Sequence, residues 1–145
     1  RTVSIFFTAA AVSGLICQKI WQLVSRVAAD RQKLIDVTLY AGGEKIQVKA
    51  LKDTGNMLED PVSAAPVSIL DPALYQKMPE QKSIRYIPYR CIGSEGIMQV
   101  FRIERMCIHA DEDRWIERPL LGVSQMKLTE NGEYQLIFNP DTLKQ

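Results

Sequence analysis

The residues best suited to chemistry in this sequence are Asp53, Thr54 and Gly55, which follow one another directly. The run before them, 46–51, alternates apolar and polar residues, as a half-buried β-strand does, and so delivers the Asp53 carboxylate into a turn. The Thr54 hydroxyl can brace this turn, and Gly55 lets the backbone bend without a Cβ in the way. A carboxylate held in this manner can act as a general acid or base.

Peptide hydrolysis by carboxyl groups needs two of them, a base that activates water and an acid that protonates the carbonyl oxygen. Two carboxyl groups about 3 Å apart cannot both ionise, so they share one proton and titrate as a pair. The sequence holds one Asp-Thr-Gly and no internal repeat that could hide a second. This chemistry therefore predicts a symmetric homodimer, with Asp53 from each subunit on the two-fold axis and Thr54 hydrogen-bonding across it.

The other candidate side chains fit structural roles better. Asp71 is suited to a helix N-cap, Asp60 stands before a proline, and the acids at 111–113 form a solvated loop. His109 is the only histidine, which makes a His-based triad or a His-rich metal site hard to build, and we expect no metal and no cofactor. An odd number of cysteines without Cys-x-x-Cys spacing indicates buried or free thiols in a reducing compartment: Cys17, Cys91 and Cys107.

The elements around the turn are mostly short strands with a period of two. The expected strands are 34–40, 44–51, 66–70, 84–89, 97–103, 106–110, 115–121 and 134–138. A turn at 41–43, a helix over 73–78 and a short helix around 125–128 complete the pattern, and residues 122–124 interrupt it. Many short strands at this spacing predict an all-β sandwich or barrel.

The N-terminal segment is apolar, and residues 2–18 carry no charge. Three interpretations compete: the last transmembrane helix of a larger protein, an amphipathic dimerisation helix and a core helix. We favour the first because charge is absent all round the helix, although the run falls slightly short of the about 20 apolar residues of a full span. Trp21, Lys19 and Arg26 would mark an interface and a cytoplasmic exit. Residues 27–33 are interpreted as helix end and linker, and the start at Arg1 without Met indicates an excised piece.

Composition fits one globular domain with a short appendage. The chain has 145 residues, 46% hydrophobic and 24% charged, which is enough to build a core. Lys+Arg 18 against Asp+Glu 17 is near balance, and no basic block suggests direct binding of nucleic acid. We expect a division into 1–33 and 34–145.

Three features follow one another along the sequence. They are the strand that ends in Asp-Thr-Gly, a hairpin with a glycine-bounded tip, and an apolar-apolar-Gly element near the C-terminus. This order resembles the retropepsin-type aspartic proteases, in which the last element packs beneath the Asp-Thr-Gly loop and a flap covers the substrate. The resemblance implies a mainly β fold, a retropepsin-like closed β-barrel half of the acid protease type, with short helices and an N-terminal apolar helix.

A narrower resemblance rests on residues 53–61, 66–67 and 87–93, which look like the sporulation sigma-E factor processing peptidase family of endospore-forming bacteria. The resemblance covers roughly 34–140. It implies a membrane-anchored aspartic endopeptidase that acts as a homodimer and removes the pro-sequence of a sigma factor precursor. It also implies a protease domain facing the mother-cell cytoplasm and a switch by a signalling protein from the forespore.

The resemblance carries roles onto individual residues. Asp53 corresponds to the catalytic aspartate, supported in its loop by Thr54, Gly55 and Asn56. The flap and substrate-binding residues are Arg90, Cys91, Ile92, Gly93, Ser94, Glu95 and Gly96. The loop-packing residues are Leu120, Leu121 and Gly122.

Two positions depart from the retropepsin pattern. Lys52 stands where an apolar residue is usual, and because a buried lysine is costly we expect it to point outward, on the opposite pleat face to Asp53. Asn56 stands where a small residue is usual, and the sporulation family tolerates Asn there.

Other functions compete with proteolysis. The main alternative is a retropepsin-like domain that binds peptides or dimerises without cutting. An aspartyl-phosphate enzyme is disfavoured because Lys52 precedes the aspartate and no P-loop or second acidic cluster for magnesium is evident. A purely structural β-domain is the remaining alternative.

Overall fold

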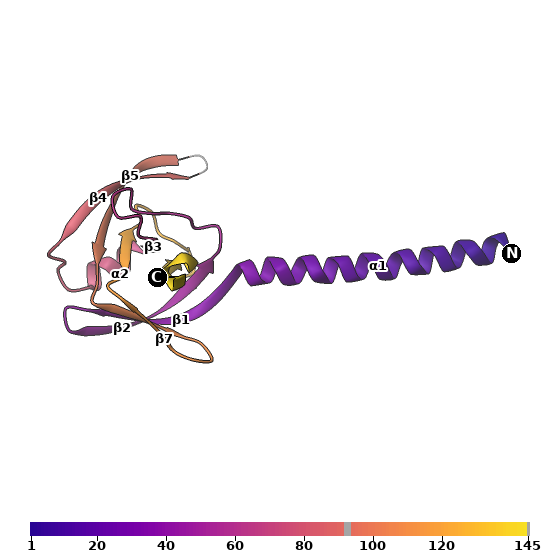
Figure 1. The fold of residues 1–145 in the computed structure, drawn as a ribbon, viewed down its shortest axis with the longest axis horizontal. Helices are drawn as coiled ribbons and strands as arrows, with labels where there is room; N and C mark the ends of the chain where they lie inside the picture. The colour runs from indigo at the N-terminus through magenta and orange to yellow at the C-terminus, as the bar shows by residue number, and fades with distance from the viewer. Residues whose placement is uncertain (92–93, 145) are drawn as a thin grey trace. The chain divides into compact units, whose positions relative to one another are not determined.

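The computed structural model describes residues 1–91 and 94–144. Its chain divides into two compact units, 1–32 and 33–145. The first unit contains the helix α1 (Thr2–Arg31; Figure 1). The side chains of residues 1–26 are exposed. Residues Thr2–Arg26 are long and apolar enough to cross a membrane.

The end of α1 differs from the expected linker at 27–33. The helix continues to Arg31, and the first strand, β1 (Gln32–Ala41), begins at the next residue. No glycine or proline occurs over 25–33, so nothing in the backbone chemistry ends the helix earlier.

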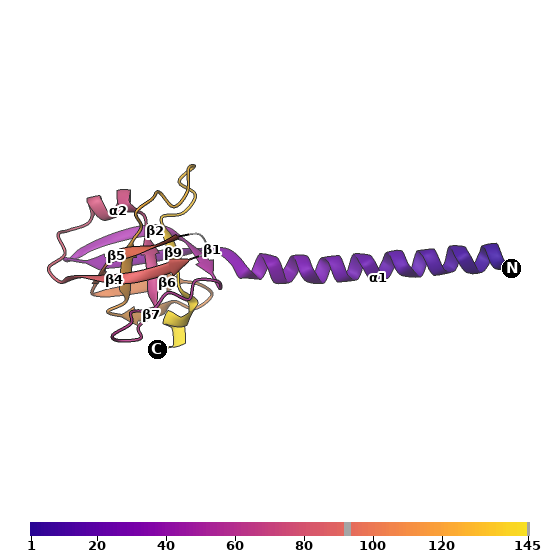
Figure 2. The same ribbon diagram turned by 90° about the horizontal axis from the view of Figure 1, so that it is seen from above.

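The second unit is one nine-stranded sheet with two short helices (Figures 1 and 2). The other strands are β2 (Glu44–Asp53), β3 (Val67–Leu70), β4 (Ile84–Cys91), β5 (Ser94–Arg102), β6 (Arg105–His109), β7 (Arg114–Glu117), β8 (Leu120–Val123) and β9 (Leu136–Phe138). The helices are α2 (Pro72–Lys77) and the 3-10 helix η1 (Pro140–Lys144). The strand order is β4-β5-β8-β3-β9-β2-β1-β6-β7. The mainly β prediction is confirmed.

The sheet curls around one main apolar core. Side chains from distant strands meet there: Phe101 of β5, Leu121 of β8, Phe138 of β9, Leu39 of β1 and Met106 of β6 are all fully buried. Each side chain of this size contributes about 1.5–3 kcal/mol through burial, so the curled sheet holds its strands firmly. A smaller cluster lies where the β4–β5 hairpin packs on β3 and β8; it contains Val67, Ile87, Met98, Val100 and Leu120.

The expected strand over 115–121 is in fact two strands. Arg118 has a φ of 49°, in the left-handed region, and Pro119 has no N–H to donate, so β7 ends and β8 begins around them. Gly122 belongs to β8 and does not interrupt the pattern.

The helix expected around 125–128 is not formed. The Ser124 hydroxyl donates to the Met126 carbonyl (2.6 Å) and accepts from the Met126 N–H (3.1 Å), a local turn that competes with a helix. By contrast, the helix expected over 73–78 is present as α2, and Asp71 is its N-cap, with its carboxylate accepting from the Ala73 N–H at 2.9 Å.

Candidate active site

Asp53 is the last residue of β2, and its position is set by a parallel neighbour. Strand β9 pairs with β2 in the register Ala50–Leu136, Leu51–Ile137 and Lys52–Phe138. Leu136 and Phe138 are fully buried, which anchors this pairing in the core. Asp53 directly follows the last of these pairs, so a buried part of the sheet fixes the position of Asp53 at the end of β2.

The turn after Asp53 is held by hydrogen bonds to the Asp53 carbonyl and to the Asp53 carboxylate. The Asn56 N–H donates to the Asp53 carbonyl at 3.1 Å, and the Gly55 N–H donates to Asp53 Oδ1 at 2.9 Å. A Cβ on residue 55 would lie 3.2 Å from the same Oδ1, so glycine leaves room for the carboxylate. Asp53 Oδ2 has no hydrogen bond within the described residues, and Asp53 is half-buried while Thr54 is exposed. One carboxylate oxygen is thus held and the other is available.

Two asparagine amides tie the following loop to the sheet. Asn56 Nδ2 donates to the Val67 carbonyl at 3.2 Å, and Asn56 Oδ1 accepts from the Leu58 N–H at 3.1 Å. Asn139, directly after β9 and fully buried, donates from Nδ2 to the Leu58 carbonyl at 3.0 Å. Its own N–H donates to Ser68 Oγ at 3.0 Å. Sequence reasoning missed Asn139 and Ser68; the Asn-Pro pair after the last strand was the only local signal.

The apolar-apolar-Gly element lies in β8, which is separated from β2 by the two strands β3 and β9. Leu120, Leu121 and Gly122 pair in parallel with Val67–Ile69 of β3, and with β5 on the other side. β2 lies between β9 and β1, and Asn139, directly after β9, contacts the loop that follows Asp53. Gly122 is closely packed, since a Cβ there would lie 2.4 Å from Met98 Sδ and 3.1 Å from Val67 Cγ1, so a larger residue would displace the Met98 side chain.

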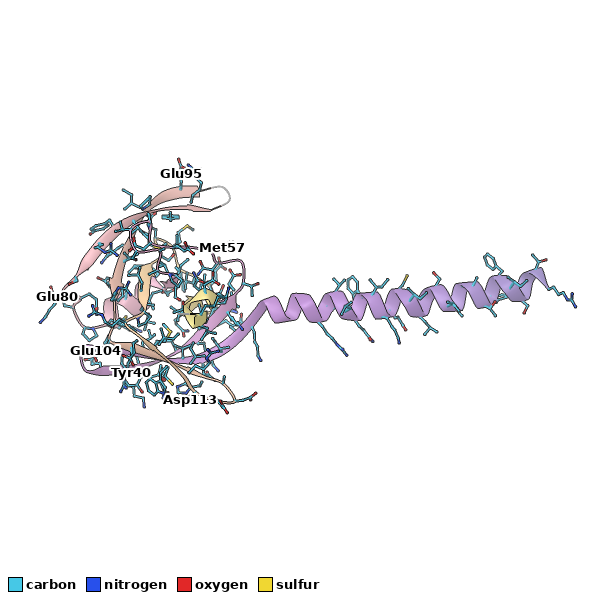
Figure 3. All side chains as sticks on the ribbon, in the orientation of Figure 1. Tyr40, Met57, Glu80, Glu95, Glu104 and Asp113 are labelled. Carbon is cyan, nitrogen blue, oxygen red and sulfur yellow. The ribbon has the colours of Figure 1, made fainter. Side chains whose placement is uncertain are left out.

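The expected flap is the antiparallel hairpin of β4 and β5. Arg90 pairs with Glu95 across it, and their side chains form an exposed ion pair at 3.3 Å. A Cβ at Gly96 would lie 3.1 Å from the Tyr89 ring, so this glycine lets the ring cross the hairpin. Figure 3 shows Glu95 near the far end of the hairpin. The predicted flap residues Ile92 and Gly93 lie outside the described residues, as do the side chains of Cys91 and Ser94.

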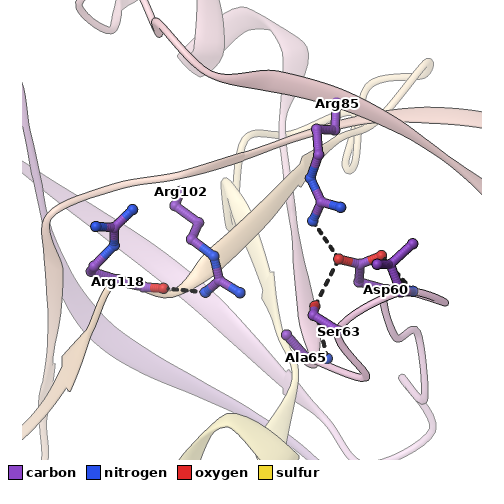
Figure 4. Close-up of polar contacts among 7 residues, drawn as sticks. Asp60, Ser63, Ala65, Arg85, Arg102 and Arg118 are labelled. Carbon is purple, nitrogen blue, oxygen red and sulfur yellow. Dashed lines mark hydrogen bonds and ion pairs between the residues drawn. The ribbon is translucent and has the colours of Figure 1, made fainter.

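A buried carboxylate joins the loop after Asp53 to this hairpin (Figure 4). Asp60 is fully buried and accepts hydrogen bonds from Ser63 Oγ at 2.7 Å, from the Val62 N–H at 3.0 Å and from the Arg85 guanidinium of β4. Burial alone raises the pKa of Asp60, but the Ser63 and Val62 hydrogen bonds and the Arg85 charge outweigh it and lower the pKa to about 2. Asp60 is therefore a structural anion and not a proton donor near neutral pH.

Comparison with known protein families shows which family the chain belongs to. The chain matches, over residues 2–142, the model of a peptidase family described as sporulation factor SpoIIGA. The chain belongs to this family.

Relatives within the family carry matching names. The chain is 23% identical to the sporulation sigma-E factor-processing peptidase of Priestia megaterium, covering 74% of this chain and 43% of the relative. It is 24% identical to the protein of the same name from Bacillus subtilis, covering 77% and 45%. It is 27% identical to a Bacillus thuringiensis subsp. kurstaki protein provisionally named a sporulation sigma factor-processing peptidase, covering 77% and 84%. The chain thus spans less than half of the two sigma-E relatives.

Lys52, the departure noted beside Asp53, is half-buried in this family member. Strand alternation places it on the opposite face of β2 from Asp53, but this is the face of the fully buried Ala50, so the expectation that Lys52 points outward is not met. Within the described residues no ion pair involves Lys52. The site in one chain therefore presents a single carboxylate in a braced turn, which is half of what an acid–base pair needs.

Proposed function

We propose that this chain is the aspartic protease part of a sporulation sigma factor-processing peptidase, with Asp53 as its catalytic residue. The observation that carries the proposal is the braced turn, in which Asp53 leaves a core strand with Oδ1 held by Gly55 N–H and Oδ2 available. Membership of a peptidase family supplies the reaction class, and the names of the relatives supply a sigma factor precursor as the substrate.

The working enzyme is a homodimer in this proposal, because one chain offers one such carboxylate. The two Asp53 side chains share a proton; the ionised one activates a water molecule, and the protonated one donates to the carbonyl oxygen of the scissile peptide. Thr54 is exposed, and its hydroxyl has no partner within the described residues, so it is available to hydrogen-bond across the two-fold axis. The β4–β5 hairpin covers the substrate, with Arg90 and Glu95 near its end.

The N-terminal unit anchors the enzyme. Residues 1–33 end the last transmembrane helix and lead into a protease domain over 34–145 on the cytoplasmic, mother-cell side. Confinement of two chains to one membrane raises their effective concentration, so a weak dimer interface can be switched by an external signalling protein.

The test is co-expression of the full-length protein with its candidate sigma factor precursor, scored by precursor cleavage on a gel. Asp53→Ala should abolish cleavage with the protein level unchanged, since a general acid–base group contributes about 100-fold or more. Asp111→Asn, in an exposed loop, is the matched control and should cleave normally. Cleavage that persists in Asp53→Ala would overturn the proposal and favour a domain that binds without cutting.

A further inference from the structure

A thiol, an imidazole and a carboxylate meet on the β6–β7 hairpin, on strands other than the one that carries Asp53. Cys107 and His109 are alternate residues of β6, so their side chains share a face of the sheet. Asp113 ends the loop before β7 and lies near the hairpin end in Figure 3. His109 Nδ1 is 3.9 Å from Cys107 Sγ and 3.2 Å from Asp113 Oδ1, and the candidate ligand atoms of all three residues lie within 4.8 Å of one another.

We propose that Cys107, His109 and Asp113 bind a transition-metal ion of the zinc class, with three protein ligands and a fourth position open to water. Zinc bonds to sulfur, nitrogen and oxygen of roughly 2.0–2.3 Å place tetrahedral ligand atoms roughly 3.3–3.6 Å apart. The two separations from His109, 3.9 and 3.2 Å, are close to these values, and the third, between the ligand atoms of Cys107 and Asp113, is within 4.8 Å and shortens when the exposed Asp113 side chain moves toward the sulfur.

The orientation of the imidazole supports coordination through Nδ1. His109 Nε2 lies 2.7 Å from the Thr38 hydroxyl, and Thr38 is fully buried in β1, directly opposite Cys107 in the strand register. A metal-binding histidine usually has its second ring nitrogen fixed by such a partner. His109 Nδ1 faces both the Cys107 sulfur and the Asp113 carboxylate. A proton on Nδ1 can be donated to only one of these two groups, whereas a cation can bind Nδ1, the sulfur and the carboxylate together.

The donor set decides which ions the site takes. Thiolate and imidazole favour Zn²⁺ and Co²⁺, whereas Mg²⁺ and Ca²⁺ require oxygen ligands. The His109 and Asp113 side chains are 42% and 53% exposed, so an ion can enter from solvent while the Cys107 sulfur forms the buried wall.

Neighbouring charges do not block the site. The nearest cation on β6, Arg105, has its guanidinium carbon 4.8 Å from the Tyr40 ring centre and 4.6 Å from that of Trp115, where the two rings hold it. The expectation of no metal was based on the single histidine, whereas in this proposal one thiol and one carboxylate complete a set of three ligands.

The test is a titration of the tag-free full chain, reduced and in detergent micelles, with Co²⁺ followed by absorption. We expect a thiolate-to-cobalt charge-transfer band that Zn²⁺ abolishes by competition. Cys107→Ser should lose the band, while Cys17→Ser, on the exposed α1, should keep it. Asp113→Asn should weaken Co²⁺ binding by about tenfold or more, whereas Asp111→Asn in the same loop should leave it unchanged.

Several results would overturn the metal site, and none of them bears on proteolysis. Absence of the charge-transfer band in the wild-type chain would do so, as would a band that survives in Cys107→Ser. Equal weakening by Asp111→Asn and Asp113→Asn would show a diffuse acidic effect. Since Asp113 is exposed, its variant keeps the test valid even if Cys107→Ser is found by circular dichroism not to fold.

Discussion

The Arg85 guanidinium of β4 donates to the buried carboxylate of Asp60, which lies in the loop that follows Asp53. This pair connects the segment that carries the candidate catalytic residue to the hairpin that is proposed to cover the substrate. Asp60 is fully buried, whereas the Arg85 side chain is 47% exposed, so the pair is buried on one side only. The contribution of this pair to the unfolding free energy, and the change of that contribution with pH, can both be measured.

Arg85→Met should destabilise the fold because it leaves the Asp60 charge buried without its cation. Loss of one partner of a fully buried pair costs about 3–5 kcal/mol, and the exposure of Arg85 lowers the expected value to about 2 kcal/mol. Arg90→Met is the matched control, since the Arg90–Glu95 pair on the same hairpin is exposed on both sides and should change the unfolding free energy by about 0.5 kcal/mol or less. Urea unfolding followed by tryptophan fluorescence measures both; equal effects would contradict a special role for Arg85.

The same carboxylate makes the fold sensitive to acid. The pKa of Asp60 is about 2 in the folded chain and 3.8 as the ordinary value, so the folded state binds this proton less readily than the unfolded state. The stabilisation is fully present above about pH 4 and is lost as the pH falls toward 2. Asp60→Asn should therefore show a flatter dependence of the urea midpoint on pH between about 4 and 2 than the wild type. Parallel curves for the two proteins would contradict this assignment.

Asn139→Ala should impair the proposed Asp53 site, although Asn139 lies outside the turn that carries Asp53. The substitution removes the Nδ2 donor to the Leu58 carbonyl and so releases the loop after Asp53, at a cost of about 1–3 kcal/mol for the buried group left without a partner. We expect reduced cleavage of the precursor together with a lower urea midpoint. Asn131→Ala, in an exposed turn, should change neither quantity. Normal cleavage by Asn139→Ala would show that the loop does not need this contact.

Thr54→Val tests the proposed two-fold arrangement. The side chain is exposed in one chain, so its replacement should leave the unfolding free energy within about 0.5 kcal/mol of the wild type. If Thr54 hydrogen-bonds across the dimer axis, the variant should instead lose dimerisation in analytical ultracentrifugation and lose cleavage with it. Thr54→Ser retains the hydroxyl and should restore both. A Thr54→Val chain that dimerises and cleaves normally would remove Thr54 from the interface.

Local chemistry made the turn at Asp53 predictable from sequence. The alternating strand, the Asx-type contact to the Gly55 N–H and the helix cap at Asp71 depend on residues a few positions apart. The Asp60–Arg85 pair could not be predicted in this way, because its partners are 25 residues apart and meet through the hairpin packing.

Strand order was the other unpredictable part. The position of Leu120–Val123 beside β3 and of β9 beside β2 depends on pairing between strands that are far apart in sequence, which local patterns do not specify. The break at Arg118 was hidden by the apolar residues on both sides of it, although Pro119 was a signal against one continuous strand.

The pairing of β9 with β2 has a consequence for the order of events during synthesis. The loop at residues 53–66 is held by Asn139, which is separated from Leu58 by 81 positions along the chain. A ribosome that has made the whole hairpin of β4 and β5 has therefore still not made the residues that hold this loop. The nascent chain therefore lacks this contact until β9 and Asn139 have emerged, so the loop after Asp53, and with it the proposed site, is completed late in synthesis.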